Sequence, residues 1–166
     1  SIVVGGLNNT SSGYYSFIGG GYGNIASGDQ SSVGMGYGNT ASGSHSTVSG
    51  GQNNNGSGAR SFIGGGTGNT SSAYYSFLGG GSSNTASNTN ATVVGGQNNE
   101  SSGSRSFIGG GRNHTASNTA SIVVGGSSNT ASGYSSIIVG GINNISSGYN
   151  SFIGGGFGHT ASASFS

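Results

Sequence analysis

Few side chains in this sequence are suited to acid–base or metal chemistry. They are one aspartate, one glutamate and three histidines, namely Asp29, Glu100, His45, His114 and His159. A serine hydrolase needs a base beside its nucleophile and an acid that orients that base. Serines are abundant here, but a single Asp and a single Glu leave almost no way to complete a triad. We therefore expect no catalytic residues and no enzyme activity.

Metal and cofactor sites are not expected either. His114 and His159 occupy equivalent positions of a 15-residue repeat, three repeats apart, which at the spacing of stacked strands is about 14 Å. Glycine-rich stretches such as G-G-G-Y-G lack the Lys and the following helix of a phosphate-binding loop. Asp29 stands alone, whereas calcium-binding β-rolls repeat Asp beside Gly.

The charge pattern excludes further partners. The net charge is +1, and the only full positive side-chain charges are Arg60, Arg105 and Arg112, which give no electrostatic footprint for nucleic acid. No apolar run approaches the roughly 18 residues that cross a bilayer, so we expect no membrane insertion. Cysteine is absent, so the fold needs no oxidising compartment.

A repeat of constant length organises the whole chain. Aligning the S-F-I-G-G-G segments gives a period of 15 without insertion or deletion, with Gly always at position 6 and Ser always at position 12. A disordered low-complexity chain would accumulate length changes, whereas a coil stacked on its neighbours cannot change length without losing register. We predict a single repetitive segment over residues 1–166, whose repeats begin at residues 1, 16, 31, 46, 61, 76, 91, 106, 121, 136 and 151.

The pattern within each repeat predicts an all-β parallel solenoid. Position 3 is always a branched aliphatic residue and position 11 is always Ser, Ala or Gly, as expected for two short strands that face each other across a thin interior. Glycine-rich turns would connect the strands. Eleven coils at about 4.8 Å each predict a rod on the order of 50 Å long. Because strand side chains alternate, positions 1, 3, 5, 9 and 11 should face inward and positions 2, 4, 10 and 12 outward.

The outward column at position 2 is unexpectedly apolar. Phe at position 2 is followed by Gly at position 4, whereas Ile at position 2 is followed by Val. Such volume matching indicates that something packs on this face. We expect self-association here, most simply as a homotrimer. A side pocket covered by position 7 of the same chain is the alternative. The predicted interface residues are Ile2, Phe17, Phe62, Phe77, Phe107, Ile122, Ile137 and Phe152.

The second strand predicts two polar columns. Asn fills position 9 except at His114 and His159, and we expect these inward amides to hydrogen-bond to one another from coil to coil. Position 10 faces outward and is rich in threonine. Its Thr row would be the binding surface if the chain bound ice, and consists of Thr10, Thr40, Thr70, Thr85, Thr115, Thr130 and Thr160.

Two resemblances suggest functions. The segments Y-Y-S-F-I-G-G-G-Y-G-N-I-A-S-G and N-T-A-S-G-Y-S-S-I-I-V-G-G resemble the left-handed parallel β-rolls of trimeric autotransporter adhesin heads and the repeats of phage and large-virus tail fibres. Adhesin heads usually have 14-residue repeats, with Ala where this chain has Gly. This resemblance implies a left-handed, trimeric fibre or stalk on a virion or outside a cell, with receptor recognition by regions outside this segment. N-T-A-S-G at residues 39–43 is similar to the half-coils of grass ice-binding proteins, which implies an antifreeze alternative.

Two further expectations follow. A surface adhesin could also bind a ligand through aromatic corners formed by Tyr14, Tyr15, Tyr74, Tyr75 and Tyr149. Neither end shows the polar capping coil that solenoids use to block an open edge, so we expect the segment to be part of a longer chain.

Overall fold

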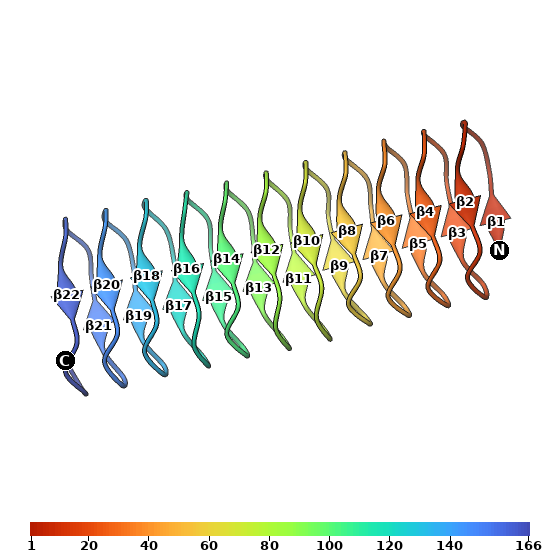
Figure 1. The fold of residues 1–166 in the computed structure, drawn as a ribbon. Helices are drawn as coiled ribbons and strands as arrows, with labels where there is room; N and C mark the ends of the chain where they lie inside the picture. Colours follow the sequence, from red (N-terminus) through yellow and green to blue (C-terminus); the bar gives the residue numbers. More distant parts are fainter.

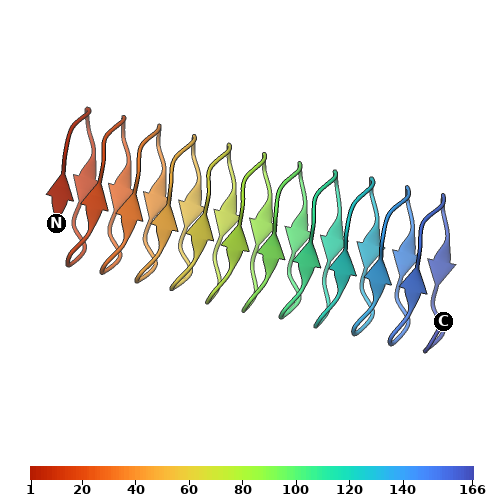
Figure 2. The same ribbon diagram turned by 180° about the vertical axis from the view of Figure 1, so that it is seen from behind.

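The computed structural model describes residues 1–166 and shows a straight parallel β-solenoid of eleven coils, with the two chain ends at opposite ends of the rod (Figures 1 and 2). Each coil contributes one strand of two residues to each of two 11-stranded parallel sheets. Every strand pairs with its equivalents in the preceding and following coils, so Phe77 lies between Phe62 and Thr92. The predicted fold class, coil number and constant register are confirmed. The structure forms no helix long and apolar enough to span a membrane.

The strands alternate between the sheets along the chain. The first sheet contains β1 (Ile2–Val3), β3 (Phe17–Ile18), β5 (Ser32–Val33), β7 (Thr47–Val48), β9 (Phe62–Ile63), β11 (Phe77–Leu78), β13 (Thr92–Val93), β15 (Phe107–Ile108), β17 (Ile122–Val123), β19 (Ile137–Ile138) and β21 (Phe152–Ile153). The second sheet contains β2 (Thr10–Ser11), β4 (Ile25–Ala26), β6 (Thr40–Ala41), β8 (Asn55–Gly56), β10 (Thr70–Ser71), β12 (Thr85–Ala86), β14 (Glu100–Ser101), β16 (Thr115–Ala116), β18 (Thr130–Ala131), β20 (Ile145–Ser146) and β22 (Thr160–Ala161).

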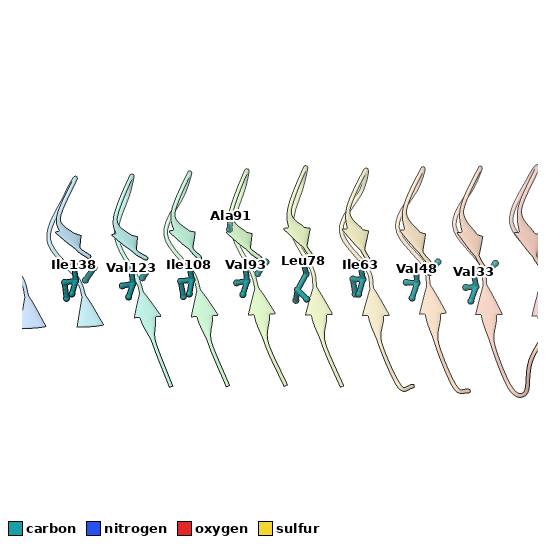
Figure 3. Packing of buried hydrophobic residues seen from close by; sticks show 14 of the residues in the cluster. Val33, Val48, Ile63, Leu78, Ala91, Val93, Ile108, Val123 and Ile138 are labelled. Carbon is teal, nitrogen blue, oxygen red and sulfur yellow. The ribbon is translucent and has the colours of Figure 1, made fainter. Parts of the chain in front are cut away.

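The core is a single file of aliphatic side chains between the two sheets (Figure 3). Position 3 is buried from Ile18 to Ile153, and the small residues at position 11 face it. Val3 differs because it lies in the first coil and has a neighbour on one side only, which leaves it 45% exposed. The prediction that position 3 is buried in every coil is therefore wrong for this coil alone.

Position 5 was predicted to point inward and does not. Met35, which is the only side chain larger than hydrogen in this column, is exposed. The strand ends before position 5, so the alternation that holds for positions 1 and 3 no longer applies there.

The buried Asn column has different partners from those predicted. The Nδ2 of Asn84 donates to the carbonyl oxygens of Gly80 in its own coil and Gly96 in the next, at 3.0 and 2.9 Å. Its Oδ1 accepts the backbone N–H of Asn99 at 2.9 Å. Each side-chain amide thus links a turn of its own coil to the backbone of the next coil, and no Asn side chain hydrogen-bonds to another Asn side chain. These contacts satisfy groups that would be costly to bury unpaired.

A third ladder, absent from the sequence prediction, runs along position 7. Isolated parallel bridges connect each position 7 residue to its equivalent, from Leu7 and Tyr22 through to Ile142 and Phe157. This column lies at the edge between the two sheets and most of its side chains are exposed. Its backbone pairing adds a further set of hydrogen bonds between coils, such as Tyr22 N–H to the oxygen of Gly36 at 2.9 Å.

Candidate interaction faces

No pocket opens on the rod, so the candidate sites are its faces and edges. No three His, Asp or Glu side chains come together where they could hold a metal ion. His45 is exposed at an edge, with its Nδ1 2.8 Å from the hydroxyl of Ser44. His114 is buried in the Asn column, and His159 is exposed in the last coil.

The outer face of the first sheet carries the predicted interface column. Its side chains are exposed or half-buried, and the rings of Phe62 and Phe77 stack with their centroids 5.4 Å apart. Phe17 and Phe77 are each 39% exposed even though coils cover them on both sides. The eight predicted interface residues therefore lie in one surface column, in runs of two, two and four that are separated by Ser32 with Thr47 and by Thr92.

The Phe and Gly pairing on this face has an explanation within one chain. A Cβ added to Gly64 would lie 3.5 Å from Cε1 of Phe62, and one added to Gly109 would lie 3.4 Å from Cε1 of Phe107. The Phe ring therefore lies over the glycine two residues later, in van der Waals range of the point where a side chain at position 4 would begin. Volume matching on its own thus requires no partner, and the case for an interface depends on the exposed apolar surface.

Charge is distributed unequally around the rod. Positions 2 and 4 carry no charged residue in any coil. All five charged side chains lie on the opposite face or on the edges, at positions 7, 10, 14 and 15: Arg112, Glu100, Asp29, Arg60 and Arg105. The first-sheet face is thus both apolar and uncharged.

The outer face of the second sheet carries the threonine row. Position 10 is exposed or half-buried, and the Ser at position 12 lies on the same face two residues later. The row is interrupted by Ile25, Asn55, Glu100 and Ile145, so the longest uninterrupted Thr runs are Thr70 with Thr85 and Thr115 with Thr130.

The predicted aromatic corners form separate clusters along one edge. Tyr74 and Tyr75 pack ring to ring with centroids 4.2 Å apart, and both hydroxyls accept hydrogen bonds from Nη1 of Arg60 in the preceding coil. The hydrogen bonds of Tyr75 with Tyr74 and then with Arg60 lower its pKa below the usual tyrosine value. Tyr14 and Tyr15 repeat the ring geometry without an arginine.

Tyr149 does not belong to either of these clusters. It stacks instead on Tyr134 of the coil before, and Phe165 packs against its edge.

The comparisons with known proteins give no family. No family model matches the chain, and no curated protein matches it. The fold and its faces therefore carry the functional argument.

Proposed function

We propose that this chain is a non-catalytic structural rod that self-associates through the outer face of its first sheet, as part of a viral tail fibre or cell-surface adhesin. The supporting observation is the apolar column at position 2, which is Phe or Ile in eight of the eleven coils, on a face without charge. A soluble monomer rarely leaves such a column facing water.

The thin core gives this face a thermodynamic reason to be covered. Each coil after the first buries one aliphatic side chain at position 3 against a Ser, Ala or Gly, so the interior supplies little apolar contact per residue. Full burial of a Phe or Ile side chain contributes about 1.5–3 kcal/mol of stability. The Phe and Ile side chains at position 2 are only partly buried in the single chain, so they contribute only part of this amount. Covering them would add stability to every coil that carries one.

A second copy of the same rod is the partner that fits this face. Parallel copies at the same height would place equivalent coils side by side, and the constant 15-residue register would keep equivalent position 2 residues opposite one another in every coil. No like charges would meet, because the face has none. We propose a trimer at a virion or cell surface, in keeping with the resemblance to fibre and adhesin repeats, with receptor binding by other regions.

Analytical ultracentrifugation tests the proposal directly. The triple variant Phe62→Ser, Phe77→Ser, Phe107→Ser removes three rings from the proposed interface. The matched control Thr70→Ser, Thr85→Ser, Thr115→Ser changes the same three coils on the opposite face. We expect the wild type and the control to sediment as oligomers and the Phe variant as a monomer with unchanged β-type circular dichroism. A monomeric wild type, or an oligomeric Phe variant, contradicts the proposal.

Ice binding is the second candidate, supported by the aligned Thr and Ser rows on the second sheet. Glu100 interrupts the longest potential Thr row, because Thr70 and Thr85 precede it and Thr115 and Thr130 follow it in consecutive coils. Glu100→Thr would complete five threonines in succession. An ice-binding protein should then show a larger thermal hysteresis than the wild type, with Glu100→Gln as the control that removes only the charge. Zero hysteresis in both the wild type and Glu100→Thr removes this candidate.

A further inference from the structure

Two pairs of exposed tyrosines stack across neighbouring coils. Tyr22 and Tyr37 lie in successive bridges of the position 7 ladder, with ring centroids 5.2 Å apart and planes inclined by 9°. Tyr134 and Tyr149 lie in successive coils at position 14, with centroids 5.1 Å apart and planes inclined by 5°. All four rings are between 42% and 52% exposed, so they are accessible from solvent.

The other tyrosine pairs differ in geometry. Tyr14 with Tyr15 and Tyr74 with Tyr75 are neighbours in the sequence, and their ring planes are inclined by 60° and 64°. Of these four pairs, only the two that span neighbouring coils have nearly parallel rings. The chain thus contains two parallel pairs and two inclined pairs, which can be compared within one molecule.

We propose that the two parallel pairs are sites of oxidative cross-linking, which forms dityrosine between coils. A peroxide acting with a one-electron oxidant such as a haem peroxidase would remove one electron and one proton from each phenol. The two tyrosyl radicals then couple through a bond between their Cε carbons, and the hydrogens on those carbons move to the phenol oxygens. The pair loses two hydrogen atoms in total, and one hydrogen peroxide is reduced to two waters.

The fold favours coupling within the pair over coupling elsewhere. Tyr22 and Tyr37 are paired in the position 7 ladder, and the residue after Tyr149 donates its backbone N–H to the oxygen of Tyr134 at 2.9 Å, so hydrogen bonds between coils keep each radical beside its partner. Side-chain rotation on the nanosecond scale can bring the two Cε atoms together without opening the coil. A link of this kind would join coils 2 and 3 and coils 9 and 10 covalently.

Tryptic mapping separates the two parallel pairs from each other and from Tyr74 with Tyr75, while Tyr14 and Tyr15 share a peptide with Tyr22 and Tyr37. Cleavage after the three arginines gives peptides 1–60, 61–105, 106–112 and 113–166. The pair Tyr22 and Tyr37 falls in the first peptide and the pair Tyr134 and Tyr149 in the last, while peptide 61–105 contains Tyr74 and Tyr75 alone. Dilute protein is treated with a haem peroxidase and hydrogen peroxide, unfolded, digested and weighed by mass spectrometry.

We expect peptides 1–60 and 113–166 each to lose two hydrogen atoms, with blue dityrosine fluorescence, while peptide 61–105 keeps its mass. In Tyr37→Phe, peptide 1–60 should keep its mass and peptide 113–166 should still be cross-linked, and Tyr149→Phe should give the converse. Equal loss in peptide 61–105, persistent loss from peptide 1–60 in Tyr37→Phe, or no loss from either parallel pair overturns the proposal.

Discussion

Each coil reverses direction twice, through positions 5 to 8 and through positions 13 to 15, and the two turns restrict the sequence to different degrees. In the first turn, position 6 is Gly in all eleven coils and has φ between 87° and 115°. In the second turn, position 15 also has positive φ in every coil, between 51° and 60°, yet it is never Gly. Positive φ therefore does not by itself require glycine here.

Crowding between coils does not require glycine by itself either. A Cβ added to Gly58 at position 13 would lie 2.1 Å from the carbonyl oxygen of Ala73 in the next coil, and Gly103 is similarly crowded. The same position nevertheless holds Ala73 and Asn88 in other coils, so the backbone can adjust there. At position 6 the two restrictions coincide, because a Cβ on Gly96 would lie 2.2 Å from the oxygen of Gly111 at a φ of 89°. Only this combination leaves no alternative to glycine.

Gly96→Ala should therefore produce the largest loss of stability. The left-handed backbone costs an L residue about 1–2 kcal/mol, and the collision with a neighbouring backbone adds to this, giving roughly 4 kcal/mol or more in total. Gly95→Ala is the adjacent control, since nothing lies within 4 Å of its added Cβ. Denaturant unfolding followed by circular dichroism measures both. A similar small loss in the two variants would show that crowding and φ do not act together.

The buried His114 gives the first turn a pH-dependent element. His114 takes the place of Asn in the buried Asn column at position 9. Its Nδ1 accepts the backbone N–H of Asn129 at 3.1 Å, while its Nε2 is buried without a hydrogen-bond partner. Burial lowers the pKa of His114 below the usual histidine value of about 6.5. The unfolded chain then binds a proton more readily than the folded chain, so stability should fall as the pH drops below about 6.5.

His114→Asn should remove this part of the pH dependence and restore two hydrogen bonds to backbone carbonyls, for a gain of about 1–3 kcal/mol at low pH. Unfolding at pH 7.5 and pH 5 measures the change, with the exposed His45→Asn as the control. If His114→Asn retains the full loss of stability at pH 5, burial of His114 is not its cause.

The second turn depends on serine pairs that are complete in some coils and incomplete in others. Ser76 Oγ lies 2.7 Å from Ser71 Oγ and also donates to the oxygen of Ala73. In another coil, Ala41 stands in the place of Ser71 and Ser46 in the place of Ser76. The buried hydroxyl of Ser46 therefore has no hydrogen-bond partner. Ala86 and Ala91 show that a coil can use alanine at both positions.

Ser76→Ala should therefore destabilise the rod by about 1–2 kcal/mol, because it leaves Ser71 without its partner, whereas Ser46→Ala should stabilise it by up to about 1 kcal/mol. Thermal unfolding of the two variants should move in opposite directions. Two shifts of the same sign would mean that the Ser46 hydroxyl is satisfied in solution.

The sequence predicted those parts of the fold that depend on side-chain type. The unbroken aliphatic column at position 3 and the small residues at position 11 place the core, and the constant period gives the coil number. The position 7 ladder could not be predicted because its pairing is made by backbone groups, and its side chains range from Leu7 to Arg112. The partners of the Asn amides were missed for a related reason: the carbonyls they reach belong to glycines, which leave no side-chain signal.

The candidate interface was predictable as a column but not in its contacts. Alternation from position 3 places Phe62 and Phe107 outside, and the structure agrees. That each ring lies over a glycine of its own coil depends on the rotamer of the ring and the local backbone, which the pattern of Phe and Gly did not reveal. The pattern alone therefore suggested a partner where the chain itself supplies the contact.

The smallest expected effect lies in the second turn, at a residue whose side chain is a single methyl group. Ala120 has φ of 56°, a conformation that glycine adopts without strain. Ala120→Gly should relieve about 1–2 kcal/mol of backbone strain in the folded chain. Because glycine also has greater freedom in the unfolded chain, we expect a net stabilisation of only about 0.5–1 kcal/mol. Ala59→Gly, at position 14 where φ is not positive, should instead destabilise the rod by a similar amount. Both variants keep the fold, so precise thermal unfolding of each can resolve the sign. If Ala120→Gly also destabilises the rod, the left-handed residues of the second turn are unstrained. The absence of glycine from position 15 would then mean that the turn itself favours residues with a side chain there.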